Sequence, residues 1–91
     1  PDTVLAGGIT LVAPVIPNVT TATKGHNDGR IVVPDTLKDS NGGTVKVTSV
    51  INDAHGKVAT NGQLAPGAYN VTFSADGYKD VTAGVSVTNK P

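Results

Sequence analysis

The chain contains no Cys, Met or Trp, and it has few aromatic or charged residues. Without cysteine, disulfide bonds and thiolate metal sites are excluded, so packing alone must stabilise the fold. Glu is also absent, because all seven acidic residues are Asp. Seven basic residues balance them to a formal net charge of zero. Since the basic residues are scattered along the sequence, we expect no nucleic-acid partner and no surface for anionic membranes.

Long apolar runs are missing as well. No segment approaches the roughly 20 apolar residues that a membrane helix needs, so membrane insertion is not expected. The first residues carry no basic stretch, and Gly7-Gly8 followed by Pro14 would interrupt a helical apolar segment. We therefore do not expect a signal peptide in these residues.

The residues that are abundant favour β-structure. The chain holds 14 Val and 12 Thr against 4 Leu, with 11 Gly and 6 Pro. β-branched residues suit strands, and frequent Gly and Pro end them, so the pattern predicts many short strands. At 91 residues the chain is long enough for one domain with a thin core. An all-β sandwich or barrel is the expected class.

Two regions differ in composition. Residues 1–17 form an apolar Pro/Gly-rich arm or linker with one charged residue, and residues 18–91 form the folded body. The arm is too apolar for an idle linker, which is normally rich in polar residues. We expect it to bind a partner through Val4, Leu5, Ile9, Leu11 and Val12. The alternative is that a strand within residues 8–12 begins the sandwich of its own body.

The body is expected to form about seven short strands. Alternating residues place Tyr69, Val71 and Phe73 on one inward face. Residues 35–40 are expected to form one helical turn or an irregular crossing. Six of the expected strands cover residues 19–23, 30–33, 44–51, 57–60, 69–75 and 81–87.

The strongest local signal is the stretch from residue 64 to residue 69. A Leu, a Pro-Gly turn and a Tyr that opens a strand are typical of the passage from one sheet to the other in small β-sandwiches. The residues expected to build this turn and the adjoining core are Leu64, Pro66, Gly67, Tyr69, Val71 and Phe73.

Residues that could support chemistry are sparse. His26 and His55 lie in turn sequences without a second ligand at metal-binding spacing, and no Ser lies in a nucleophile elbow. We therefore expect neither an enzyme nor a cofactor. Hard oxygen ligands could gather calcium, but turn geometry explains them more simply and no calcium motif is present. These residues are Asn27, Asp28, Asn52, Asp53, Asn61 and Asp76.

Three segments together resemble the immunoglobulin-like repeats of bacteria and phages. They are residues 27–33 (NDGRIVV), 64–73 (LAPGAYNVTF) and 85–88 (VSVT), and the resemblance covers about residues 18–89. A weaker similarity links residues 53–78 to prealbumin-like and Cna-type modules. The resemblance implies an immunoglobulin-like Greek-key β-sandwich with an N-terminal extended arm, used for display or attachment and without catalytic residues.

Three functions follow from these observations. The first is a non-enzymatic module on a phage virion surface, as a capsid or tail decoration that the arm anchors to a protein lattice. Such a module could aid weak attachment to a host-surface glycan, for which Tyr78 is the one available aromatic ring. The second is an immunoglobulin-like repeat of a bacterial cell-surface adhesin or stalk protein. The third is a structural subunit that polymerises by donating residues 4–12 to the next copy.

Overall fold

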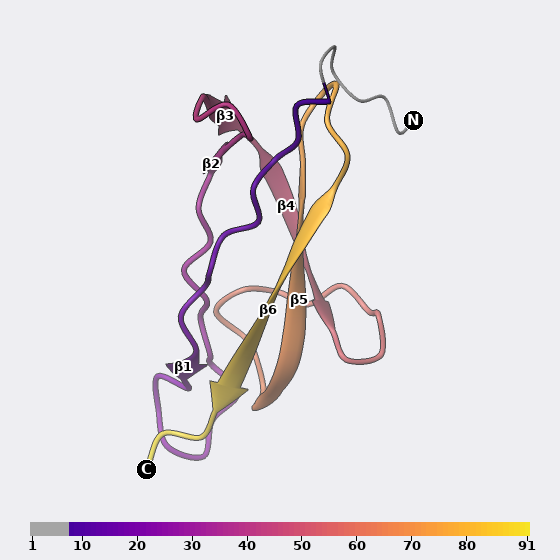
Figure 1. The fold of residues 1–91 in the computed structure, drawn as a ribbon. Helices are drawn as coiled ribbons and strands as arrows, with labels where there is room; N and C mark the ends of the chain where they lie inside the picture. Colours follow the sequence, from indigo (N-terminus) through magenta and orange to yellow (C-terminus); the bar gives the residue numbers. More distant parts are fainter. Residues whose placement is uncertain (1–7) are drawn as a thin grey trace.

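The computed structural model describes residues 8–91. These residues form an all-β fold of six strands in two layers (Figure 1). A four-stranded sheet has the order β1-β6-β5-β4, and a two-stranded sheet pairs β2 with β3. The predicted sandwich-like all-β class is confirmed, with six strands in place of about seven. Among residues 8–91 no helix is long and apolar enough to cross a membrane.

The larger sheet is built on a meander of three strands. β4 (Thr48–Asp53) pairs antiparallel with β5 (Gly67–Ser74), and β5 pairs antiparallel with β6 (Val81–Thr88). The short β1 (Val19–Thr20) runs parallel to the end of β6. The first strand is therefore an edge strand of this sheet and lies next to the last strand.

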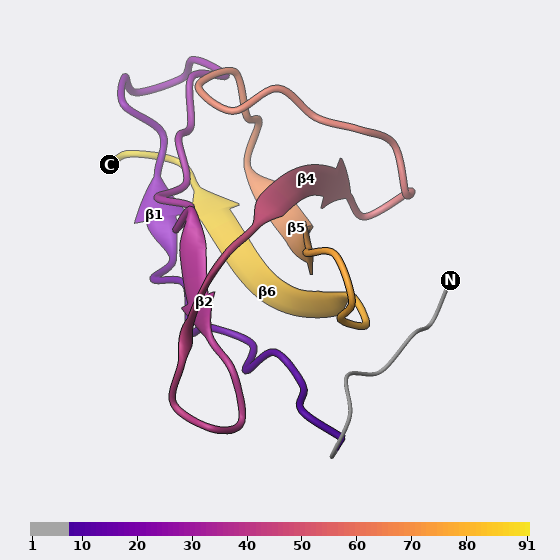
Figure 2. The ribbon, with the colours of Figure 1, turned by 90° about the horizontal axis from the view of Figure 1, so that it is seen from above.

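The smaller layer is a hairpin with an added segment. β2 (Thr36–Lys38) pairs with β3 (Thr44–Lys46). Along the other side of β2 lie residues 10–12, where the Val12 amide donates to the Lys38 carbonyl at 2.8 Å and Ser40 donates to Thr10 at 2.7 Å. In Figure 2 this hairpin stands away from β4 and β5, as a second layer.

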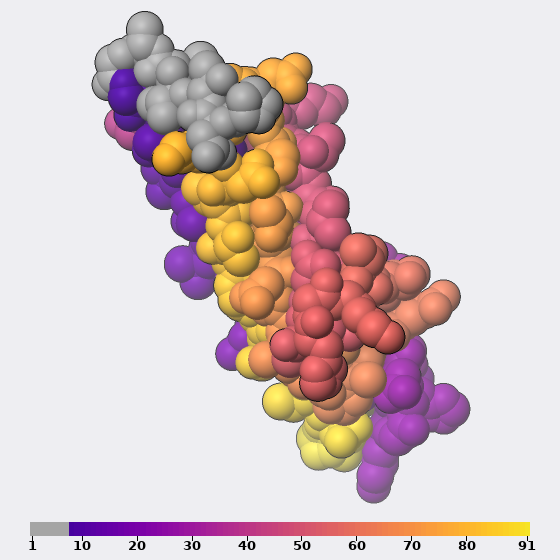
Figure 3. All heavy atoms as spheres, turned by 90° about the vertical axis from the view of Figure 1, so that its right-hand side faces the viewer, coloured from indigo at the N-terminus to yellow at the C-terminus, as the bar shows by residue number. Residues whose placement is uncertain are grey.

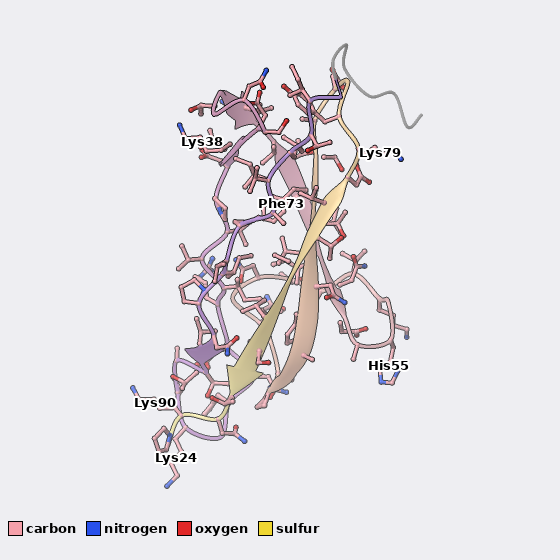
Figure 4. All side chains as sticks on the ribbon, in the orientation of Figure 1. Lys24, Lys38, His55, Phe73, Lys79 and Lys90 are labelled. Atoms are coloured by element: carbon pink, nitrogen blue, oxygen red, sulfur yellow. The ribbon has the colours of Figure 1, made fainter. Side chains whose placement is uncertain are left out.

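The core lies between the two layers. Phe73 and Val71 on β5 are completely buried, and Phe73 points from the sheet toward the second layer (Figure 4). The alternation predicted for residues 69–75 and 81–87 is confirmed on the buried face. The buried apolar residues are Leu11, Ile16, Ile31, Leu37, Val47, Ile51, Leu64, Tyr69, Val71, Phe73, Ala83, Val85 and Val87.

Several predicted elements are wrong in kind or extent. Residues 35–40 hold strand β2 where a helical turn or irregular crossing was expected, and the single strand expected over residues 44–51 is divided at Val47 between β3 and β4. The Val47 amide still donates to the Asp35 carbonyl, which continues the β2–β3 pairing by one residue, and from Thr48 the chain pairs with β5 in the other sheet. The strand expected over residues 57–60 is reduced to one bridge between Asn52 and Val58.

Residues 30–33 form no strand either, although Ile31 is almost completely buried. The backbone here passes close to residue 64, and a Cβ on Gly29 would lie 2.8 Å from the Leu64 carbonyl oxygen and from a Val87 methyl. Gly29 is therefore required for this close approach. A neighbouring side chain satisfies the Ile31 backbone, as described below.

Truncating Phe73 is expected to destabilise the domain more than any other single truncation. Its ring is fully buried at the centre of a thin core, so Phe73→Ala should lower the free energy of unfolding by about 3–5 kcal/mol. Urea unfolding monitored by circular dichroism measures this loss. Val15→Ala, on a side chain that is 95% exposed, serves as the control. A Phe73→Ala loss no larger than that of Val15→Ala would contradict the prediction.

Candidate interface

The N-terminal arm divides at about residue 10. Val4 and Leu5 lie outside the described residues. Ile9 is half-buried, and Leu11 forms a bridge with Asp39 next to the hairpin. Leu11 is buried in the core, whereas Val12 is half exposed. Residues 10–12 thus contact their own body.

The rest of the arm follows the same layer. Ile16 is buried with Leu11 in the core, while Val15 points away from it and is 95% exposed. The alternating pattern is that of an extended segment packed on one side. The two buried residues show that part of the predicted 1–17 arm belongs to the packed structure of the body.

The turn from residue 64 to residue 69 lies where the sequence predicts it, but it joins neighbouring strands. β4 and β5, on either side of it, pair within one sheet, so the expected passage between sheets is wrong. Leu64 is 1% exposed and bridges to Gly29, and Pro66 and Gly67 are exposed. The Tyr69 hydroxyl donates to the Ala65 carbonyl at 2.6 Å, a contact that resembles the tyrosine corner of immunoglobulin-like sandwiches.

Asn61 has a structural role, although its sequence context predicts only a turn residue. Its Oδ1 accepts from the Ile31 amide at 2.8 Å, and its Nδ2 donates to the Ile31 carbonyl at 2.8 Å. The Asn61 side-chain amide therefore makes the two hydrogen bonds to the buried Ile31 backbone that a paired strand would otherwise make. Because the partner lies 30 residues away, no local sequence signal marks this role.

Replacing Asn61 should leave the Ile31 amide and carbonyl without partners. Because Ile31 is 1% exposed, we expect Asn61→Ala to lower the free energy of unfolding by about 2–3 kcal/mol. Asn41→Ala, at an exposed turn position, should change it by less than about 0.5 kcal/mol. Urea unfolding of both variants decides the matter, and equal losses would show that the Asn61 amide is not needed.

The candidate oxygen ligands serve their own turns. Asp28 accepts from the Thr23 amide, and Asp53 accepts from the His55 and Lys57 amides at 2.8 and 3.0 Å. Hydrogen bonds from Thr23 lower the pKa of Asp28, and the Lys57 amide is the main cause of the lowered pKa of Asp53. Within residues 8–91 no group of three His, Cys, Asp or Glu side chains is placed to hold a metal ion.

The lowered pKa of Asp53 predicts a loss of stability in acid. A depressed pKa stabilises the fold above the usual value of 3.8, and this stabilisation is lost as the pH falls through the lower folded value. Asp53→Asn keeps an accepting oxygen but cannot titrate, so its unfolding free energy should fall less than that of the wild type between pH 6 and pH 2.5. Asp80→Asn, at another exposed Asp, is the control. Denaturant unfolding at each pH measures the difference, and parallel pH curves for wild type and Asp53→Asn would refute the prediction.

A hollow lies at the end of the sandwich that carries the β5–β6 turn. It has a volume of about 580 Å³, and Lys46, Asp76, Tyr78 and Asp80 contribute to its lining. The Tyr78 hydroxyl donates to Asp39 Oδ2 at 3.2 Å, so Tyr78 ties this turn to the β2–β3 hairpin. The nearby carboxylate and desolvation raise the pKa of Tyr78, with desolvation the larger cause. Both histidines are exposed, and His55 projects from the loop after β4 (Figure 4).

The outer face of the four-stranded sheet carries no charge among the described residues. Its outward positions on β4, β5 and β6 are Thr48, Val50, Asn52, Ala68, Asn70, Thr72, Ser74, Thr82, Gly84, Ser86 and Thr88. Design rules aim for soluble surfaces that are about 25–35% charged, and these 11 positions on three adjacent strands carry no charge at all. Figure 3 shows this face, with the loop after β4 standing out from it. A neutral face is cheaper to desolvate than a charged one and is suited to contact with protein.

A shallow groove borders this face along β4. It has a volume of about 320 Å³, and Val33, Ser49, Val50 and Val58 help to line it. Val50 and Val58 are 47% and 76% exposed. The groove and the neutral face together form the candidate interface of the domain.

The fold and this surface define a small β-sandwich. Its Asp28 and Asp53 side chains accept hydrogen bonds from turn amides, and its neutral sheet face is suited to contact with protein. Comparison with known proteins agrees with that class. Residues 10–91 match the family model of the phage tail tube protein C-terminal domain. The chain therefore belongs to this family of phage structural proteins. No solved structure shows a significant match.

Individual relatives carry the same description. The chain is 90% identical over 89 residues to the tail tube proteins of Lactococcus phage F4-1 and Lactococcus phage p2, and 88% identical to that of Lactococcus phage SK1. The aligned segment covers 98% of this chain and 30% of each relative. The chain thus spans about three-tenths of the length of the curated relatives it matches.

Proposed function

We propose that the chain is a non-enzymatic structural domain of a phage tail tube subunit and is located in the tail of the virion. The family match over residues 10–91 is the observation that carries this proposal. The relatives at 88–90% identity support it, because each is named as a tail tube protein.

The geometry is compatible with a domain that works by contact. Its apolar residues enclose a core of their own, so it can be added to a larger subunit as a folded unit. Asp28, Asp53 and Asn61, the residues with the most chemical promise in the sequence, bind backbone groups of the fold. The Tyr69–Ala65 contact and the two layers support an immunoglobulin-like sandwich as its architecture.

The proposed role agrees with the three functions expected from the sequence to different degrees. A phage virion component agrees with the first expectation, but the comparisons support neither capsid decoration nor adhesion to a host glycan, and they give no support to a bacterial cell-surface protein. A tail tube is a polymer of repeated subunits, so the third expectation, a polymerising structural subunit, is the closer one. Donation of all of residues 4–12 would break the hydrogen bonds that hold Thr10 and Val12 on their own hairpin.

The proposed location can be tested on purified virions of a phage that encodes the chain. Tails and capsids are separated, and peptides of residues 8–91 are quantified by mass spectrometry in each fraction. We expect these peptides in the tail fraction at the same molar ratio as peptides from the rest of the tail tube subunit. Their recovery with capsids, or their absence from virions, would overturn the proposal.

A further inference from the structure

The edge of β4 is only partly covered. Beyond β4, the Ala59 amide donates to the Ile51 carbonyl, and the Asp53 amide donates to the Lys57 carbonyl. The backbone groups of Ile51 and Asp53 that make these bonds therefore point away from β5. Because this direction repeats every second residue along an antiparallel strand, the amide and carbonyl of Ser49 point to the same edge. No backbone partner for Ser49 is present among residues 8–91.

Apolar side chains lie beside this free stretch. Val50 is on the outer face of the sheet, and Val33 and Val58 line the groove beside the edge. An added strand would therefore find the amide and carbonyl of Ser49 at its centre and valine side chains beside it. This is the arrangement that β-strand addition uses.

Protection against strand addition is present elsewhere but missing here. Exposed edges are usually guarded by charged residues, above all Lys. β3 carries Lys46, and the free side of β2 is covered by residues 10–12. The free stretch of β4, residues 48–50, has the sequence Thr-Ser-Val and no charge.

We propose that the free edge of β4 at Thr48–Val50 accepts an extended segment, residues 3–6, from a neighbouring copy of the same protein. This inference rests on the proposed function, because a tail tube places identical subunits side by side. A contact between two different surfaces of one subunit is head-to-tail, and head-to-tail contacts build rings and filaments. The edge and the donated segment are such a pair.

The choice of donor follows from the division of the arm. Residues 10–12 are held on β2 by backbone hydrogen bonds, so the proposed donor is placed before them in the chain. Residues 3–6, Thr-Val-Leu-Ala, are uncharged. Four extended residues span about 13 Å, which is enough to follow the three-residue free stretch. Successive side chains of a strand alternate, so Val4 and Leu5 would face opposite sides of the sheet, one of them the side of Val50.

The test measures self-association of the 91-residue chain by sedimentation velocity over a range of concentrations. Ser49→Pro removes the outward amide without removing a bond to β5, and Val50→Lys places a guarding charge beside the edge. Both should raise the dissociation constant at least about tenfold. Val15→Lys makes the same change at a more exposed valine away from the edge, and it should associate like the wild type.

The donor is tested by a mixing experiment. Leu5→Asp damages the donated segment and leaves the edge intact, whereas Ser49→Pro does the reverse. Each variant alone should be monomeric, and an equimolar mixture should form a one-to-one heterodimer. Thermal unfolding of each variant tests whether it is folded. If Ser49→Pro does not fold, Val50→Lys replaces it as the edge variant.

Three results would overturn the inference. They are a wild-type chain that stays monomeric up to about 1 mM, edge variants that associate like the wild type, and a mixture that stays monomeric. A Leu5→Asp variant that still forms a dimer on its own would also overturn it, and would indicate that two β4 edges pair with each other. If the chain is found in tails but the edge variants have no effect, only this inference fails. If edge-dependent association is seen and the chain is absent from tails, only the proposed location fails.

Discussion

The contact between residues 29–31 and residues 61–64 holds the two layers of this small domain together. Gly29 and Leu64 exchange backbone hydrogen bonds at 2.9 and 3.2 Å, and Asn61 satisfies both backbone groups of Ile31. Because the chain has no cysteine, no covalent link secures this junction. The core on either side of it depends on Ile31 and Leu64, which are each 1% exposed. A single amide side chain and one glycine therefore decide whether the second layer can close over β5 and β6.

Side chains near the surface also hold the fold together. Asp28 and Asp53 are used to fix turns, and Tyr78 ties the β5–β6 turn to the hairpin through Asp39. On the neutral outer face of the sheet, Asn52 donates to the Gly56 carbonyl at 3.1 Å and so fixes the loop after β4, whereas Val50 is 47% exposed and Ser49 has no backbone partner among the described residues. The chain belongs to the phage tail tube protein C-terminal domain family, and these surfaces are the ones on which the contacts proposed above depend.

Much of the fold was predictable from local pattern. β-branched composition predicted the class, and the alternation of Tyr69, Val71 and Phe73 predicted the buried face of β5. The errors fell where pairing partners are far apart in the sequence. Residues 30–33 have the composition of a strand, yet the Ile31 backbone is bonded to a side chain 30 residues away. Residues 35–40 have little strand character of their own and become β2 because β3 pairs with them.

The sequence by itself determined the all-β class, the inward rows of β5 and β6, and the absence of disulfide support, since these depend on composition and on a two-residue period. Tertiary structure decided which half of the arm packs against its own body, which loop covers part of β4, and which three residues of that strand keep an open edge. Each of these depends on hydrogen bonds between residues distant in the chain, and those bonds form only when the two layers have come together. Local periodicity carries no record of such partners.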